Sequence, residues 1–127
     1  MDAAGFASWV AGYERAWRAP GTDLLATLFA DDAAYLMSPY ADPVVGLEAI
    51  SELWEAERDG PEEVFTMTSQ VVAFSGDTGV ARVHVVYGAP YREWRDIWIV
   101  RFDGQGRAVH FEEWPIGPPG AHRPSGL

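Results

Sequence analysis

The side chains of this sequence that could move a proton are its carboxylates, three histidines and five tyrosines. Cysteine, lysine and asparagine are absent from the 127 residues. Their absence excludes thiolate nucleophiles, disulfides, Schiff-base lysines and the lysine-dependent phosphate loop. No His-x-His or His-Glu-x-x-His spacing typical of a metal site occurs. We therefore expect acid–base chemistry that needs no metal and no other cofactor.

Asp96 is the carboxylate whose surroundings best suit such chemistry. It alternates with Trp94 and Trp98 in a β-prone segment, so the three side chains are expected on one face of a strand. A carboxylate held against aromatic rings is desolvated, which raises its pKa and suits a general acid or base. The alternative is a strand-end aspartate paired with a nearby arginine.

Glu112 and Glu113 are neighbours near the end of the chain, in a second β-prone segment. Adjacent strand residues point to opposite faces, and alternation with Phe111 favours Glu113 on the inner face. A β-bulge would exchange the two. A sheet-edge salt bridge or a dimer contact is the alternative to a catalytic role.

His84 and His110 are the remaining candidates for proton transfer. Alternation with Val83 and Val85 places His84 on the face opposite to the apolar one, where a dimer surface is the alternative to catalysis. His122 lies in the C-terminal tail.

Six tryptophans and five tyrosines exceed what a core of this size requires. Tyrosine and tryptophan have polar tips that favour half-buried positions, so many of them are expected around a pocket for a flat, largely apolar ligand. Ordinary core packing is the alternative for each. The expected pocket residues are Tyr13, Trp17, Tyr35, Met37, Tyr40, Trp54, Met67, Tyr87 and Trp98.

The elements that must position these residues are three helices followed by strands. Apolar spacing predicts a helix from Phe6 to Trp17, a short one closed by Asp31-Asp32, and a third from Gly46 to Gly60-Pro61. Strands are predicted over 33–38, 64–74, 80–87, 91–102 and 108–114, the last one stopped by Pro115. This order predicts an α+β fold with a mainly antiparallel sheet.

Three local motifs stand at the joints between these elements: Leu28-Phe29-Ala30-Asp31-Asp32-Ala33, Gly46-Leu47-Glu48-Ala49-Ile50, and Arg101-Phe102-Asp103-Gly104-Gln105-Gly106-Arg107. With the element order, they make the chain similar to the NTF2-like superfamily, also called SnoaL-like. The resemblance implies a cone in which three N-terminal helices pack on a curved sheet, with a pocket at the wide end. It also implies a homodimer packed through the outer face of the sheet.

Among the enzymes of that superfamily, the chain resembles the ketosteroid isomerases most. The resemblance places their oxyanion-hole tyrosine at Tyr13, their general-base aspartate at Met37 and their second oxyanion acid at Trp98. A thioether cannot take a proton, and an indole is a weaker donor than a protonated acid. Ketosteroid isomerisation by that arrangement is therefore not expected.

Residues 1–116 are expected to form one domain, followed by a Pro- and Gly-rich tail over 117–127. The net charge of −10 argues against nucleic acid or an anionic membrane as a partner. The N-terminus lacks the features of a signal peptide, so a cytoplasmic location is expected.

Two functions remain open at this point. One is a SnoaL-like isomerase, cyclase or dehydratase for an apolar, carbonyl-bearing ligand. Asp96 or Glu113 would move the proton, and Tyr13 would donate to the developing oxyanion. The other is a non-catalytic module that binds a ligand or a protein.

Overall fold

The computed structural model describes residues 1–58, 64–88 and 91–119. It has three helices and six strands, in the order α1 (Ala3–Arg18), α2 (Leu25–Leu28), β1 (Phe29–Leu36), β2 (Val44–Val45), α3 (Leu47–Glu57), β3 (Phe65–Ser75), β4 (Thr78–Gly88), β5 (Tyr91–Phe102) and β6 (Ala108–Ile116). This is the predicted α+β order, with the two-residue β2 as an addition.

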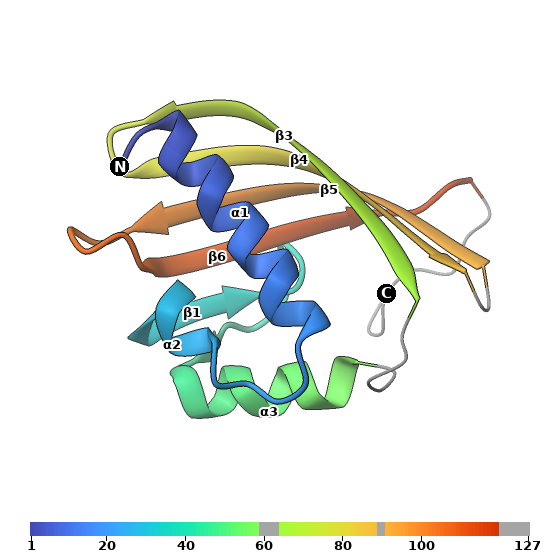
Figure 1. Cartoon of the computed structure of the whole chain (residues 1–127), viewed down its shortest axis with the longest axis horizontal. Coiled ribbons are helices and arrows are strands. Elements are labelled where there is room, and N and C mark those ends of the chain that lie inside the picture. The colour runs from blue at the N-terminus through green and yellow to red at the C-terminus, as the bar shows by residue number, and fades with distance from the viewer. Residues whose placement is uncertain (59–63, 89–90, 120–127) are drawn as a thin grey trace.

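The six strands form one curved sheet in the order β2-β1-β6-β5-β4-β3. Strands β3 to β6 follow one another as an antiparallel meander, and β1 pairs with β6 in parallel. Figure 1 shows α1 lying across the inner face of the sheet, while α3 lies below β1 at the bottom of the view.

Helix α1 is positioned by its apolar stripe and its caps. Its N-cap Asp2 accepts a hydrogen bond from the Gly5 backbone N–H at 2.8 Å, which satisfies one of the free amides of the first turn. Arg15 and Arg18 lie in the last turn, where positive charge offsets the helix dipole. The buried stripe consists of Phe6, Trp9, Val10, Tyr13 and Ala16.

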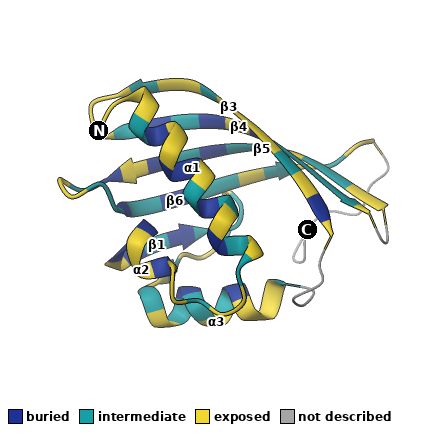
Figure 2. Ribbon diagram, in the orientation of Figure 1, coloured by how far each residue is buried: buried dark blue, intermediate teal, exposed yellow. Residues whose placement is uncertain are grey.

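Aromatic rings from α1 and the sheet form the closed end of the core. The Trp9 ring lies edge-on to Phe29 and Phe102, at 5.7 and 5.4 Å between centroids. Its indole N–H donates to the Leu28 carbonyl at 2.9 Å, so the one polar atom of this ring is satisfied. Figure 2 shows the buried residues gathered where α1 meets β4, β5 and β6.

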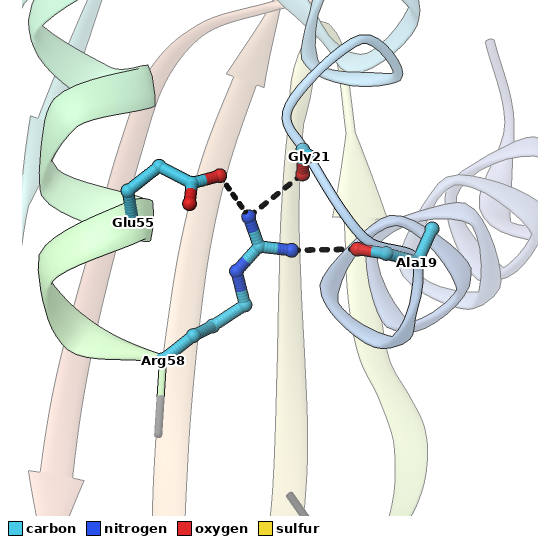
Figure 3. A network of polar contacts seen from close by, with 4 residues as sticks. All are labelled: Ala19, Gly21, Glu55 and Arg58. Carbon is cyan, nitrogen blue, oxygen red and sulfur yellow. Dashed lines mark hydrogen bonds and ion pairs between the residues drawn. The ribbon is translucent and has the colours of Figure 1, made fainter. Parts of the chain in front are cut away.

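Arg58 joins the C-terminal ends of α1 and α3, as Figure 3 shows. Its guanidinium donates to the carbonyls of Ala19 and Gly21 at 2.6 and 2.7 Å, and to Glu55 Oε1 at 2.6 Å. Ala19 is the C-cap of α1, and Gly21 follows with φ of +78°, a backbone region that glycine reaches without strain. One side chain thereby links the C-terminal ends of the two helices.

Two predicted element ends are wrong. Asp31 and Asp32 do not close a helix with a turn: α2 ends at Leu28, and both residues are exposed within β1, where its register with β6 shifts. Pro115 does not stop β6, which continues to Ile116 and pairs Pro115 with Asp96. The pairing of β1 with β6 ends at Glu112, so the missing N–H of Pro115 costs no hydrogen bond to β1.

Two further predictions fall outside the described residues, namely the Gly60-Pro61 helix stop and the tail beyond residue 119. The division into a domain over 1–116 and a tail over 117–127 stays a prediction.

Candidate functional site

A cavity of about 460 Å³ lies between α1, α3 and the inner face of the sheet. Helices α1 and α3 supply two of its walls, and β1, β3, β4, β5 and β6 supply the rest. The lining consists of Tyr13, Trp17, Tyr35, Met37, Leu53, Trp54, Glu57, Phe65, Met67, Val85, Tyr87, Arg92, Trp94, Asp96, Trp98, Glu113 and Pro115. The volume is within the range of small-molecule sites, and most of the lining is aromatic or apolar.

Most of the residues proposed from the sequence are brought together here. The carboxylates Asp96 and Glu113 line the cavity with Tyr13. The aromatic and thioether residues that join them are Trp17, Tyr35, Met37, Trp54, Met67, Tyr87 and Trp98. Their place around one cavity is a structural fact, and the role of each stays a prediction.

Tyr40 and His84 do not line the cavity. Tyr40 is 95% exposed, in the turn that follows β1. His84 lies on the outer face of β4, as alternation in the strand requires, with its Nε2 at 3.6 Å from Glu93 Oε1. Neither residue can touch a ligand held in this cavity.

Several residues of the cavity lining were not expected from the sequence. Arg92 and Trp94 share the alternation of Asp96 and Trp98 along β5, so the same pattern could have included them. Glu57 was not predicted either: its side chain is exposed, but it stands at the end of α3 and borders the cavity. No local pattern marks such a position, because it depends on how α3 meets the sheet.

Asp96 is the one buried charged residue in the described part of the chain, with 6% of its surface exposed. Its Oδ1 has no hydrogen-bond partner within that part. Burial raises the pKa of Asp96 from 3.8 to about 7, and the nearby Trp98 indole opposes the rise. No arginine within ion-pairing distance of Asp96 is found in the described residues. The side chain is therefore poised to take or release a proton near neutral pH.

Glu113 is the second carboxylate of the cavity. The register places it directly across from Trp98, and Asp96 pairs with Pro115, so the two carboxylates are diagonal neighbours on β5 and β6. Burial, the charge of Asp96 and the charge of Glu57 together raise the pKa of Glu113 well above its usual value. The raised pKa favours the protonated form of Glu113, which can donate a hydrogen bond.

The pKa of Glu112, the residue before Glu113, is shifted in the opposite direction. Glu112 lies on the outer face, where His110 Nε2 is 3.0 Å from its Oε1 and the Trp114 indole donates to its Oε2 at 2.5 Å. The hydrogen bond with His110 lowers the pKa of Glu112. Strand alternation thus separates a carboxyl group whose pKa is raised, inside the cavity, from one whose pKa is lowered, outside it.

Two tyrosine hydroxyls meet at the cavity wall. The Oη atoms of Tyr13 on α1 and Tyr35 on β1 are 2.6 Å apart and share a hydrogen bond. Burial raises the pKa of both tyrosines well above the usual value, and the charge of Glu113 adds to the rise. Both hydroxyls remain protonated, so one O–H proton is used between them and the other can be donated to a ligand.

The described residues contain no group of three or more His, Asp or Glu side chains arranged to hold a metal ion. None of the helices within the same ranges is long and apolar enough to cross a membrane.

A curved sheet with helices over its inner face, enclosing a pocket of acids and aromatic rings, defines an NTF2-like α+β protein. The family model described as "SnoaL-like domain" matches residues 10–111. The chain therefore belongs to the SnoaL-like domain family. A search of the curated proteins found no match.

Solved structures share this fold at low sequence identity. An NTF-2 like protein of unknown function from Burkholderia xenovorans is 16% identical with a TM-score of 0.69, over 95% of this chain and 88% of that one. A candidate isomerase of the SnoaL-like family from Agrobacterium tumefaciens is 16% identical with a TM-score of 0.72, over 90% and 99% of the two chains. A candidate ketosteroid isomerase from Kribbella flavida is 18% identical with a TM-score of 0.61, over 89% and 73%. At these identities the likeness establishes the fold alone.

Proposed function

We propose that this chain is an acid–base enzyme of the isomerase or lyase class that acts on an apolar, carbonyl-bearing small molecule and needs no cofactor. The observation that carries the proposal is the buried carboxylate of Asp96 in an aromatic cavity: its Oδ1 has no hydrogen-bond partner among the described residues, and its pKa is raised to about 7. Structural carboxylates are normally paired when buried, and a perturbed carboxylate in a cleft is a candidate for catalysis.

The proposed first step is removal of a proton from the carbon next to the ligand's carbonyl. Asp96 takes the proton, the C–H bonding electrons form the enolate, and the free tyrosine O–H stabilises the negative charge on oxygen. Return of the proton from Asp96 to another carbon gives an isomer. Alternatively, the neutral Glu113 protonates a β-hydroxyl group, which leaves as water while the enolate electrons form the new double bond.

The fold neighbours fit this class but do not decide it, since two of them are named only as candidate isomerases. Met37 lines the cavity where the resemblance to ketosteroid isomerases puts a general base. That substitution supports a second candidate function, a binding protein that holds an apolar ligand without converting it.

The two candidates are separated by hydrogen–deuterium exchange on a simple ketone. We would incubate 1-tetralone with the protein in D₂O and follow the loss of its C2 proton signals by NMR. Asp96→Asn keeps the shape of the side chain but cannot accept the proton, and it should slow the exchange by at least about 100-fold. Glu112→Gln is the matched control, because Glu112 lies on the outer face, and it should leave the rate unchanged. Binding of the ketone without faster exchange would favour the binding protein and reject the enzyme.

We further propose that two copies of the chain associate through the outer face of the sheet. Trp114 and Ile116 are 39% and 58% exposed there, and Trp114 lies directly across from Ile97. Aromatic and aliphatic side chains at the centre of a face, with charged residues around them, suit a contact between identical surfaces.

A further inference from the structure

The inner face of β5 passes from exposed to buried along the cavity. Its side chains on that face begin with Arg92 and continue with Trp94, Asp96 and Trp98, all of which line the cavity. Arg92 is exposed, Trp94 is half-buried, and Asp96 and Trp98 are buried. The cavity therefore meets solvent at the Arg92 end of the strand, and Asp96 lies deeper.

Arg92 belongs to a row of side chains that crosses three strands at this opening. The register makes Phe65, Tyr87 and Arg92 successive partners on β3, β4 and β5, and all three line the cavity. The guanidinium carbon of Arg92 lies 4.5 Å from the centre of the Tyr87 ring, which lies 5.7 Å from the Phe65 ring. The contact with Tyr87 restrains the cation, and an arginine has five N–H donors to share among its contacts.

A second arginine anchors the row to α1. The guanidinium carbon of Arg18 lies 3.9 Å from the centre of the Phe65 ring, and its Nη2 donates to the Phe65 carbonyl at 3.1 Å. Arg18 also pairs with Glu14 through an Nε–Oε2 distance of 2.9 Å, so its own charge is balanced within the helix. The rings against which Arg92 lies are thus held in place by contacts outside the cavity.

Charge distinguishes Arg92 from the rest of the lining. Among the described residues around the cavity, it has the one cationic side chain, whereas Glu57, Asp96 and Glu113 are acids. An anionic group of a ligand is therefore attracted at Arg92 and disfavoured next to the acids. A rise of about 3.4 Å per residue puts about 13 Å between the Cα atoms of Arg92 and Asp96. Both side chains reach into that distance, so it suits a ligand about as long as two fused rings.

We propose that the ligand of this cavity is an apolar ketone with a carboxylate at the end remote from its carbonyl, and that Arg92 binds this carboxylate at the opening. The planar guanidinium matches a carboxylate, and such pairs can be bidentate. Held in this way, the ligand lies along β5 with its carbonyl end next to Asp96, so Arg92 selects both the ligand and its orientation. The inference rests on the proposed function for the carbonyl group, but it requires binding only.

The test compares two tetralones that differ in the charge at one end. One is 1-tetralone-6-carboxylate, and the other is the neutral 6-carboxamide; in both, the substituent lies across the two rings from the reactive C2. Isothermal titration calorimetry at low salt measures the two affinities, and their ratio isolates the effect of the charge. We expect the carboxylate to bind about three- to tenfold more tightly than the carboxamide. Arg92→Gln should bring the ratio to about one, and Arg92→Lys, which keeps the charge, should retain part of the preference.

Arg95→Gln is the matched control, because it removes the same charge from β5 but from an exposed position on the outer face. It should leave the ratio within about twofold of that of the unaltered protein. A carboxylate that binds no more tightly than the carboxamide, or a preference that survives Arg92→Gln, overturns the inference. An equal loss of preference in Arg95→Gln overturns it too.

The outcomes also separate this inference from the proposed function. If 1-tetralone binds but neither substituted tetralone does, the inference alone is overturned; if none of the three binds, the proposed ligand class is rejected with it. A preference lost selectively in Arg92→Gln, without any acceleration of proton exchange, supports the inference and rejects catalysis. Exchange of 1-tetralone without any preference for the carboxylate supports catalysis and overturns the inference.

Discussion

Burial of Asp96 makes the stability of the folded chain depend on pH. The carboxyl has its usual pKa of 3.8 when the chain is unfolded and about 7 when it is folded. Between those values the folded protein keeps a proton that the unfolded chain has released. The free energy of unfolding therefore falls as pH rises through this window, by up to about 1.4 kcal/mol for each pH unit. Glu113 contributes in the same direction, since its pKa is also raised.

Replacement of Asp96 by asparagine removes this contribution and keeps the size of the side chain. We predict that the free energy of unfolding of Asp96→Asn falls less between about pH 4.5 and pH 7 than that of the unaltered protein. Above about pH 7 the variant is expected to be the more stable of the two, because it no longer buries a charge. Urea unfolding at a series of pH values measures both effects.

Glu112→Gln is the control for this prediction, and its effect has the opposite sign. The pKa of Glu112 is lowered, chiefly by its hydrogen bond with His110, so its contribution to stability is lost as pH falls below the usual range of a glutamate. The slope of the free energy of unfolding against pH should therefore differ between Glu112→Gln and the unaltered protein only at acidic pH. An Asp96→Asn protein with an unchanged slope above about pH 4.5 would show that Asp96 is ionised in the folded state.

At the scale of the elements, Arg58 holds α1 and α3 in place around the cavity. Only 9% of its side chain is exposed, and its guanidinium carbon lies 5.8 and 5.9 Å from the centres of the Trp17 and Trp54 rings. The cation therefore stabilises both the carbonyls that end α1 and the aromatic wall.

We predict that Arg58→Met destabilises the fold by about 2–4 kcal/mol, because it removes charge-assisted hydrogen bonds to Ala19, Gly21 and Glu55. Arg58→Lys keeps the charge but not the planar guanidinium, so its stability should lie between that of the unaltered protein and that of Arg58→Met. Glu55→Gln is the control: its side chain is 58% exposed, so losing that ion pair should cost less than about 1 kcal/mol. Urea unfolding measures all three, and equal losses for Arg58→Met and Glu55→Gln would refute this role for Arg58.

The elements also show what the sequence could predict. Alternation in β5 and β6 correctly indicated the inner-face positions of Asp96 and Glu113, because each strand has one apolar face and a period of two. The Arg58 contacts and the Tyr13–Tyr35 hydrogen bond could not be predicted, since they join segments 37 to 39 and 22 residues apart, respectively. The continuation of β6 beyond Pro115 could not be predicted either, because it depends on where the pairing of β6 with β1 ends. Local patterns indicate which face a residue occupies, whereas these contacts follow from how distant elements meet.

At the scale of the whole molecule, the two faces of the sheet have different chemistry. The inner face meets α1 and the cavity, and it buries the Asp96 carboxylate, whose Oδ1 has no hydrogen-bond partner in the part of the chain that the structure describes. The outer face pairs its ionisable groups: His110 with Glu112, and Arg95 and His84 with Glu93. Exposed apolar side chains lie among these pairs, and a surface of this kind is suited to contact with another protein surface.

If two copies associate through this face, Trp114 should lie in the contact, because it is a large aromatic residue on β6 opposite Ile97. We predict that the unaltered protein sediments as a dimer and that Trp114→Glu shifts it toward the monomer, since each buried glutamate would lack a partner. Analytical ultracentrifugation over a range of concentrations measures the shift.

Tyr40→Glu adds the same charge to a side chain that is 95% exposed on the loop after β1, and it should leave the dimer unchanged. A monomeric unaltered protein, or a Trp114→Glu variant that stays dimeric, would exclude this face as the interface. Ketone binding that persists in a monomeric Trp114→Glu protein would show that the cavity is complete within one chain.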